Sequence, residues 1–274
     1  MPRFDPHPER RAAVVTGASS GHGAAIATAL AAAGHPVVIG ARRLDRLEEL
    51  AAQISADGGE ALPVQLDLTD RTSITSFARR AEDELGPVEI LVSNAGDVQP
   101  ITTLADPAEF TRQLQVNLLG AQALAHELVP HMVGRSRGDV VFVTSEVAQE
   151  PRTHMAAYVA SKAGLEAYAR AMAMECEGSG VRVGIVRPGP STTEQGTTWD
   201  VDTINTVVGS WNRWGLLRHD GAIRPVEFAQ AVLAMVSAPK GTRYALLEVQ
   251  PEAPVASDHV LVDSTPSQQS EGDA

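Results

Sequence analysis

The stretch Thr16-Gly17-Ala18-Ser19-Ser20-Gly21-His22-Gly23 decides the fold of this chain. It joins an apolar run at 11–16, which indicates a buried strand, to an alanine-rich helical segment at 22–33. Its glycines allow a tight turn and a close backbone approach to a pyrophosphate, while the helix start directs N–H groups at the phosphates. A glycine-rich turn alone is a weak signal, equally typical of a plain tight turn. Between a strand and a helix it predicts a dinucleotide site.

Strand-like and helix-like segments alternate along the rest of the chain. We expect strands at 11–16, 36–40, 61–66, 88–92, 139–144, 181–186 and 244–249, and helices at 22–33, 44–56, 71–85, 107–133, 154–177 and 224–237. Short apolar runs such as VVFVT suit strands buried on both faces. The pattern predicts an α/β, doubly wound Rossmann fold: a seven-stranded, mainly parallel sheet with helices on both faces.

The segments form one domain at 11–250, preceded by a polar arm at 1–10 and followed by an acidic tail at 251–274 rich in Ser, Pro and Gln. The stretch 191–218 shows no regular period, and its part at about 191–217 is a candidate substrate lid. There are no internal repeats and no sign of a second domain.

Composition narrows the classes of partner. The chain has 274 residues, a net charge of −12 and 43% hydrophobic residues, as expected of a globular protein with a sizeable core. The negative charge disfavours nucleic acid and anionic membranes as partners. A single cysteine, Cys176, excludes an internal disulfide and fits a cytoplasmic location. The N-terminal sequence MPRFDPHPERR has no apolar signal region, and no uncharged apolar run is long enough to cross a bilayer.

A second motif lies in the middle of the chain. Tyr158 and Lys162 are four residues apart on a predicted helix, so both side chains lie on one face, and Ser145 precedes the tyrosine by thirteen residues. A nearby cation favours the phenolate, which would let the tyrosine exchange a proton near neutral pH. The YxxxK spacing alone is common in helices. Its weight comes from the glycine-rich motif in the same chain.

Together, TGxxxGxG and YxxxK resemble the motifs of the short-chain dehydrogenase/reductase family, in its short single-domain branch. Further matches are Ser93-Asn94-Ala95-Gly96, which resembles NNAG; Asn117 in QVNLLG; Asp67 in LDLTD; and Pro188-Gly189 followed by Thr193. The resemblance covers residues 11–190 motif by motif. Two positions depart from the family pattern: His22 stands where Ile is usual, and Ser93 replaces the first Asn of NNAG. We expect the imidazole to be tolerated beside the cofactor, and the serine to have a modest structural effect.

The resemblance implies a catalytic role for four residues. Tyr158 is the general acid or base, and Ser145 orients the carbonyl oxygen. Lys162 lowers the pKa of the tyrosine and holds the nicotinamide ribose, and Asn117 carries a water that links the lysine to bulk solvent. No metal is required, because the hydroxyl donors polarise the carbonyl. The expected cofactor site comprises Gly17, Ser19, Ser20, Gly21, His22, Gly23, Arg42, Arg43, Asp67, Leu68, Asn94, Ala95, Gly96, Tyr158, Lys162, Pro188, Gly189 and Thr193.

The end of the second strand bears on the choice of cofactor. An acidic residue there would bind the ribose 2′-OH of NAD, but this strand ends in Gly40-Ala41-Arg42-Arg43. Guanidinium groups suit a 2′-phosphate, so the sequence favours NADP(H), with Arg42 as the better candidate, and leaves NAD(H) open. The alternative is that both arginines are only solvated residues at the next helix.

The expected activity is interconversion of a ketone and a secondary alcohol by hydride transfer. A non-catalytic NADP(H)-binding sensor on the same fold is the alternative, but such a protein should have lost Tyr158 or Lys162. An epimerase of the family's extended branch would be longer, with a separate substrate domain. Residues 146–155 and 191–217 should form the substrate wall, with Trp199, Trp211 and Trp214 as pocket lining or, equally, as packing or subunit contacts. By resemblance, helices 107–133 and 154–177 make a homodimer or homotetramer. The sequence does not select the substrate.

Overall fold

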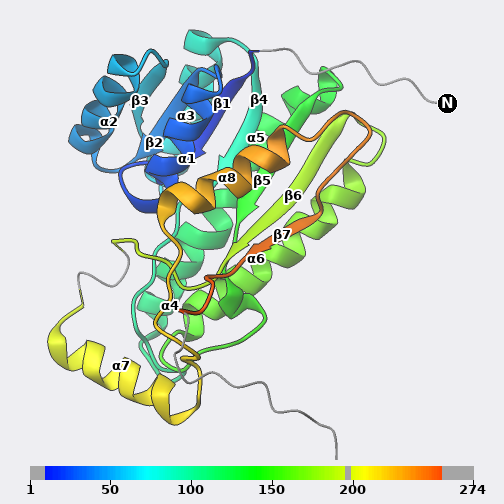
Figure 1. Ribbon diagram of the computed structural model, residues 1–274. Coiled ribbons are helices and arrows are strands. Elements are labelled where there is room, and N and C mark those ends of the chain that lie inside the picture. The colour runs from blue at the N-terminus through cyan, green and yellow to red at the C-terminus, as the bar shows by residue number, and fades with distance from the viewer. Residues whose placement is uncertain (1–9, 195–198, 255–274) are drawn as a thin grey trace, which may run out of the picture.

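The computed structural model describes residues 10–194 and 199–254, so residues 1–9 of the expected arm at 1–10 and most of the acidic tail lie outside the described residues. Seven strands form one sheet in the order β3-β2-β1-β4-β5-β6-β7 (Figure 1). They are β1 (Ala12–Thr16), β2 (Val37–Ala41), β3 (Ala61–Gln65), β4 (Val88–Ser93), β5 (Gly138–Val143), β6 (Val181–Pro188) and β7 (Leu246–Val249). Each neighbouring pair among these strands is parallel.

Helices cover both faces of the sheet. On one face lie α1 (Gly21–Ala32), α2 (Leu44–Ala56) and α8 (Pro225–Val236), which bury Ile26, Leu47 and Phe228. On the other lie α3 (Arg71–Leu85), α5 (Gly120–Gly134) and α6 (Ala156–Glu175), which bury Phe77 and Leu124. Both faces of the sheet are therefore apolar, and the doubly wound Rossmann fold predicted from the sequence is confirmed.

The order of the strands fixes where a ligand can bind. From β1 the chain continues through β2 and β3 on one side, then crosses to β4 and continues through β5, β6 and β7 on the other. A crevice opens at such a reversal, outside the carboxyl ends of the strands. The glycine-rich loop follows β1 directly, so it lies at this crevice.

The long helix expected at 107–133 is divided into three parts. Helix α4 (Pro107–Leu114) runs into a π-helical turn η1 (Gln115–Leu119), and α5 follows. Helix α5 begins at Gly120, where the backbone packs closely on Leu68. A Cβ at this position would lie 2.5 Å from the main-chain oxygen of Leu68, so only glycine fits. Turns of this kind are frequent at functional sites. This one contains Asn117, which is fully buried.

The irregular conformation expected over 191–218 is wrong in part, because Val201–Arg213 forms helix α7. The Asp200 carboxylate accepts a hydrogen bond from Thr203 N at 2.8 Å and caps its N-terminus. Its β-branched residues and Gly209 have weak helix propensity, although its apolar residues recur at helical spacing from Val201 to Trp211. Val207 is buried, whereas Val201 is exposed.

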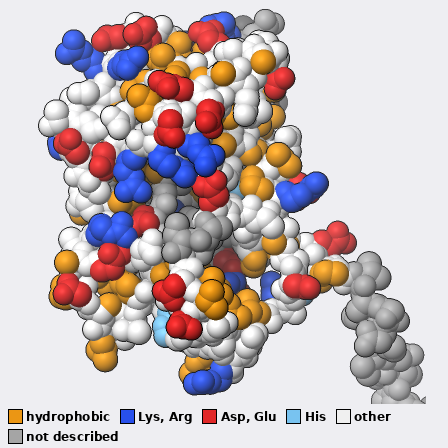
Figure 2. Space-filling model, turned by 90° about the vertical axis from the view of Figure 1, so that its left-hand side faces the viewer, with side chains coloured by type: hydrophobic (Ala, Val, Ile, Leu, Met, Phe, Trp, Pro, Cys, Tyr) orange, Lys and Arg blue, Asp and Glu red, His pale blue; other side chains and the backbone are white. Residues whose placement is uncertain are grey.

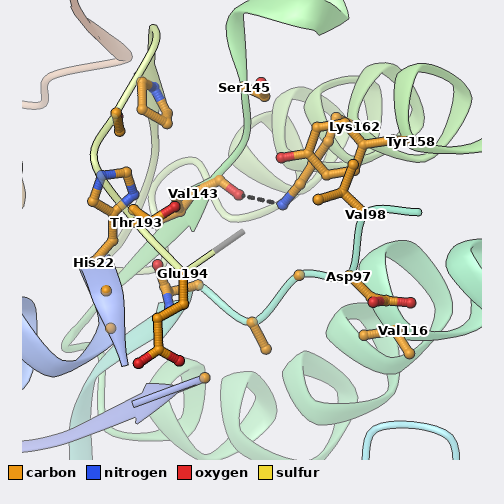
Figure 3. A pocket seen from close by; sticks show the side chains of 18 of the residues that line it. His22, Asp97, Val98, Val116, Val143, Ser145, Tyr158, Lys162, Thr193 and Glu194 are labelled. Carbon is orange, nitrogen blue, oxygen red and sulfur yellow. Dashed lines mark hydrogen bonds between the residues drawn. The ribbon is translucent and has the colours of Figure 1, made fainter. Parts of the chain in front are cut away.

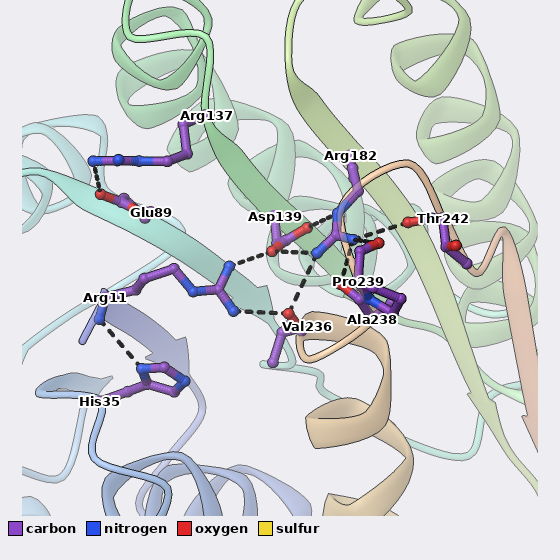
Figure 4. A network of polar contacts seen from close by, with 10 residues as sticks. All are labelled: Arg11, His35, Glu89, Arg137, Asp139, Arg182, Val236, Ala238, Pro239 and Thr242. Carbon is purple, nitrogen blue, oxygen red and sulfur yellow. Dashed lines mark hydrogen bonds and ion pairs between the residues drawn. The ribbon is translucent and has the colours of Figure 1, made fainter. Parts of the chain in front are cut away.

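A buried ion-pair network ties the elements together near the amino ends of the strands (Figure 4). Asp139 accepts from Arg11 Nη1 at 2.5 Å and from Arg182 Nε at 2.6 Å, and both arginines also donate to the main-chain oxygen of Val236. The network joins the residue before β1 to β5, β6 and α8 at the amino ends of the strands, and the glycine-rich loop lies at their carboxyl ends. No helix in the described part of the chain is both long and apolar enough to cross a bilayer.

Candidate active site

A cleft of about 560 Å³ lies at the carboxyl ends of the strands. In Figure 2, Lys and Arg side chains gather beside a hollow in this surface. Every residue expected to hold the cofactor lines the cleft, from Gly17 to Thr193. Ser145 lines it as well, whereas Asn117 is buried behind it. The structure therefore brings together segments that are far apart in the sequence.

The glycine-rich loop is tied to the end of β4. Asn94 Nδ2 donates to the main-chain oxygen of Thr16 at 2.9 Å, and Thr16 Oγ1 accepts from the backbone N–H groups of Asn94 and Ala95. A Cβ at Gly23 would lie 2.3 Å from the oxygen of Gly17, so no side chain can be placed there. Gly17 has a φ of 69°, which also favours glycine. The result is a backbone cradle with room for a pyrophosphate at the start of α1.

Two arginines line the cleft at the end of β2, and they differ in their contacts. Arg43 Nη2 donates to Ser19 Oγ at 2.9 Å and to Ser20 Oγ at 3.0 Å, so it lies against the glycine-rich loop. Arg43 also forms an ion pair with Glu194 at 3.3 Å. Arg42 contributes only its main-chain oxygen to a recorded hydrogen bond within the described residues, with Gln65. The arginine that contacts the loop is therefore Arg43 and not the favoured Arg42.

Helix α6 places Tyr158 and Lys162 on one face, pointing into the cleft (Figure 3). Lys162 Nζ lies 5.8 Å from the centroid of the Tyr158 ring and donates to the main-chain oxygen of Val143 at 2.9 Å. Burial lowers the pKa of Lys162 from 10.5 to about 8. Gly96 keeps space beside the ammonium, because a Cβ there would lie 3.4 Å from Nζ.

Asn117 lies behind the lysine. Its Nδ2 donates to the main-chain oxygen of Asp97 at 2.8 Å and to Ser161 Oγ at 3.0 Å, and its Oδ1 accepts from Asp97 N at 2.7 Å. These contacts fix the amide between the π-helical turn and α6. They also hold the segment after β4 in place beside Lys162.

Ser145 follows β5 and begins a 3-10 turn η2 (Glu146–Ala148). The preceding residue, Thr144, donates from Oγ1 to Glu166 Oε1 at 3.0 Å, and Arg187 on β6 donates to both oxygens of the same carboxylate. Glu166 therefore holds the strand end that carries Ser145. Sequence reasoning missed this residue, although it lies four positions after Lys162 on the same helix face and is an acid among apolar neighbours.

His22 packs inside the cofactor half of the cleft. Its ring stacks on Phe228 with centroids 4.2 Å apart, and its Nε2 is buried without a hydrogen-bond partner among the described residues. Burial, followed by the charge on Lys162, lowers the pKa of His22 to about 4. The imidazole is therefore neutral at physiological pH.

The other half of the cleft is mainly apolar. Val98, Val147, Met155 and Tyr158 form a buried cluster, against which two of the tryptophans, Trp199 and Trp211, pack. Of the three tryptophans expected there, Trp214 is exposed and lies outside the cleft. Within the expected substrate wall at 146–155, Glu146 lines the cleft, Gln149 donates to Glu166, and neither Glu150 nor His154 lines it.

The fold and motifs agree with known proteins. The family model described as short chain dehydrogenase matches residues 11–202, so the chain belongs to this family. It is 41% identical over 197 residues to glycine betaine reductase ATRR of Emericella nidulans, covering 71% of this chain and 15% of that protein. It is 32% identical to 2,3-dihydro-2,3-dihydroxybenzoate dehydrogenase of Bacillus subtilis, covering 85% and 91% of the two chains. It is 33% identical to cis-4-hydroxycyclohexanecarboxylate dehydrogenase of Sinomonas cyclohexanicum, covering 83% and 89%.

Two solved structures show the same fold with cofactors of both kinds. An alcohol dehydrogenase from Thermococcus sibiricus, complexed with 5-hydroxy-NADP, aligns with a TM-score of 0.77 and 28% identity, covering 90% of this chain and 100% of that one. A 7α-hydroxysteroid dehydrogenase, complexed with NADH and 7-oxo glycochenodeoxycholic acid, aligns with a TM-score of 0.76 and 27% identity, covering 87% and 92%. The fold is therefore one that binds NAD(P).

Proposed function

We propose that this protein interconverts a ketone and a secondary alcohol with NADP(H) as the redox partner. The observation that carries the proposal is the convergence of Ser145, Tyr158 and Lys162 on the cleft that the glycine-rich loop forms. The residues fit a nicotinamide dinucleotide, because the glycines leave a cradle that a Cβ would fill and Lys162 brings a cation to the same cleft. When bound, the dinucleotide supplies or accepts the hydride.

The catalytic residues handle the charge that develops on the substrate oxygen. During reduction this oxygen becomes negative, and the Tyr158 hydroxyl gives it a proton. Ser145 donates a hydrogen bond to the same oxygen and fixes its orientation. In oxidation the tyrosine acts as the base. Lys162, held by the oxygen of Val143, favours the tyrosinate and binds the ribose.

Asn117 supports the resupply of protons. Its side chain bridges the turn after β4 and Ser161, directly beside the lysine. We assign to it the water that connects Lys162 to solvent, as in the family. Glu166 supports Ser145 indirectly, by holding Thr144 and Arg187.

Preference for NADP(H) rests on the end of β2. There is no acidic side chain at its end to bind a ribose 2′-OH, and two guanidinium groups line the cleft instead. The contacts of Arg43 with Ser19 and Ser20 support a role for this arginine in binding a 2′-phosphate. The Glu194 carboxylate beside Arg43 would have to separate from it.

Two of the relatives are named for cyclic alcohols or diols that carry a carboxylate. We propose small molecules of this general kind, a ring or chain with one oxidisable carbon, as substrates. We also propose a cytoplasmic homodimer or homotetramer, formed through the helical segments 107–133 and 154–177 as the family resemblance implies.

The test of the function is a cofactor and activity assay on the full chain. Fluorescence titration should show NADPH binding, and a panel of cyclic ketones should be reduced at the expense of NADPH. Binding without turnover, together with no loss of physiological function in Tyr158→Phe, would favour the sensor. Binding of neither NADPH nor NADH would overturn the oxidoreductase.

A further inference from the structure

An ion pair lies in the substrate half of the cleft, next to the catalytic serine. Glu146 directly follows Ser145, and its carboxylate accepts a hydrogen bond from Arg152 Nη2. The side chains are only 9% and 12% exposed, and both residues line the cleft. Neither belongs to the catalytic set or to the glycine-rich loop. The pair therefore needs a separate explanation.

The guanidinium of Arg152 has a second contact, with an aromatic ring, besides its hydrogen bond to Glu146. It lies 5.1 Å above the Trp211 ring. The indole is fixed in turn, because Trp211 Nε1 donates to the main-chain oxygen of Thr153 at 2.9 Å. A hydroxyl contact of 2.8 Å between Thr153 and Ser210 holds α7 to the same segment. Arg152 is thus preorganised before any ligand binds.

Arg152 lines the cleft, and the hydrogen bonds of the described residues use only part of its donor capacity. A guanidinium has five N–H donors, and Glu146 is the one recorded hydrogen-bond partner of Arg152 within residues 10–194 and 199–254. A buried ion pair gains little stability over well-packed apolar side chains, because removing both charges from water is costly. Because stability alone does not account for such a pair beside a reacting centre, binding of a ligand is the better explanation.

The local electrostatics favour an anionic ligand. Helix α6 begins at Ala156 with no side-chain cap and no acidic residue in its first turn, so its positive end is not neutralised. Lys162 adds a cation in the same cleft. These charges offset the carboxylate of Glu146, whose contact keeps the guanidinium in one orientation. A bidentate contact with a carboxylate matches the planar fork of arginine.

We propose that Arg152 binds a carboxylate of the substrate, so that the substrate is an organic acid with its ketone or alcohol at the other end of an apolar body. The apolar body would lie against Val98, Met155 and Trp211, which line the same cleft. The assignment of the reacting end rests on the proposed function. The carboxylate subsite itself does not.

The test measures binding without turnover. Calorimetric titrations compare cyclohexanecarboxylate with cyclohexanecarboxamide, and hexanoate with hexanamide, on the wild-type chain. We expect the acid to bind at least about tenfold more tightly than its amide, as a charge-assisted hydrogen bond allows. Arg152→Gln should bring the ratio close to one, and Arg152→Lys should retain part of it. Glu146→Gln keeps an acceptor but removes a negative charge, so it should raise the ratio.

Arg170→Gln is the matched control. Arg170 also forms an ion pair with a buried glutamate, Glu166, but it lies outside the cleft, so the ratio should remain at the wild-type value. A wild-type ratio near one, or a ratio that survives in Arg152→Gln, overturns the proposal. If Arg152→Gln does not fold, the affinity ratios of acid to amide in the wild type and in Glu146→Gln test the proposal, and a ratio that does not rise in Glu146→Gln overturns it. Failure to bind NADPH would overturn the proposed function and leave this result standing.

Discussion

Lys162 Nζ donates a hydrogen bond of 2.9 Å to the main-chain oxygen of Val143, at the carboxyl end of β5. Val143 lies two residues before Ser145, so this contact links the lysine of α6 to the strand that carries the serine. The ammonium is completely buried, and this carbonyl is its one recorded hydrogen-bond acceptor within the described residues. The fold therefore fixes Lys162 relative to the strand end that precedes Ser145.

The burial of Lys162 predicts how stability changes at high pH. Burial lowers its pKa to about 8 in the folded chain from an ordinary value of 10.5, so the unfolded chain binds more protons between these values. The contribution of this group to the free energy of unfolding should therefore rise with pH from about 8 to about 10.5. Urea unfolding of the wild type and of Lys162→Met at pH 8, 9 and 10 measures the difference. The slope of the wild type should exceed that of the variant. Equal slopes would contradict the prediction.

The lowered pKa of His22 predicts how stability changes at acidic pH. Its pKa is lowered to about 4 from 6.5, so the unfolded chain binds more protons in this interval and stability should fall as the pH drops through it. His22→Ile removes the titrating group and keeps an apolar contact with Phe228. We expect a smaller loss of stability in the variant between pH 6.5 and pH 4, measured by thermal unfolding. An unchanged pH dependence would show that the imidazole does not contribute.

Arg43 predicts a selective change in cofactor binding. Arg43→Ala should raise the Kd for NADPH by about tenfold or more, since a charge-assisted hydrogen bond contributes about 1.5–3 kcal/mol. The Kd for NADH should change little. Arg46→Ala is the control, because Arg46 is an exposed residue in the first turn of α2, just after Arg43, and does not line the cleft. An equal loss for both cofactors would mean that Arg43 supports the glycine-rich loop without reading the phosphate.

Asp139 predicts a loss of stability without a loss of binding. Asp139→Asn leaves the buried Arg11 and the largely buried Arg182 without their carboxylate, which costs about 3–5 kcal/mol in comparable buried pairs. Because the network lies at the amino ends of the strands and the cleft lies at their carboxyl ends, NADPH affinity should be retained. Denaturant unfolding and fluorescence titration test the two halves of the prediction. A loss of less than about 1 kcal/mol would show that the network is not structurally important.

Strong sequence patterns account for much of the fold. The strands are short apolar runs between turns, and α2 and α3 have the bounds expected from their amphipathic periods. Sequence patterns were less informative about a change of helix type within one helical segment and about helices built from residues of weak propensity. The segment 107–133 has one helical period, so nothing in it marks the π-helical turn. Helix α7 has residues with weak propensity, but its Asp200 cap and the helical spacing of its apolar residues from Val201 to Trp211 were usable signals of a helix.

The site was predictable where motifs have fixed spacing, and less so where contacts depend on loop paths. Tyr158 and Lys162 follow from helix geometry. Whether Arg42 or Arg43 contacts the glycine-rich loop depends on the direction of the chain at the start of α2, which no sequence period indicates. Glu146 and Arg152 are brought together by an irregular turn and are six residues apart, a spacing that predicts no contact.

The central claim is that Tyr158 exchanges a proton with a carbonyl substrate in a cleft that binds NADPH. The most direct measurement compares the wild type with Tyr158→Phe, in NADPH fluorescence titrations and in NADPH-dependent reduction of cyclic ketones. We expect NADPH affinity within about threefold of the wild type and a fall in kcat of about 10²-fold or more, because the phenyl ring keeps the packing but has no proton to give. A variant that retains the wild-type kcat would contradict the account.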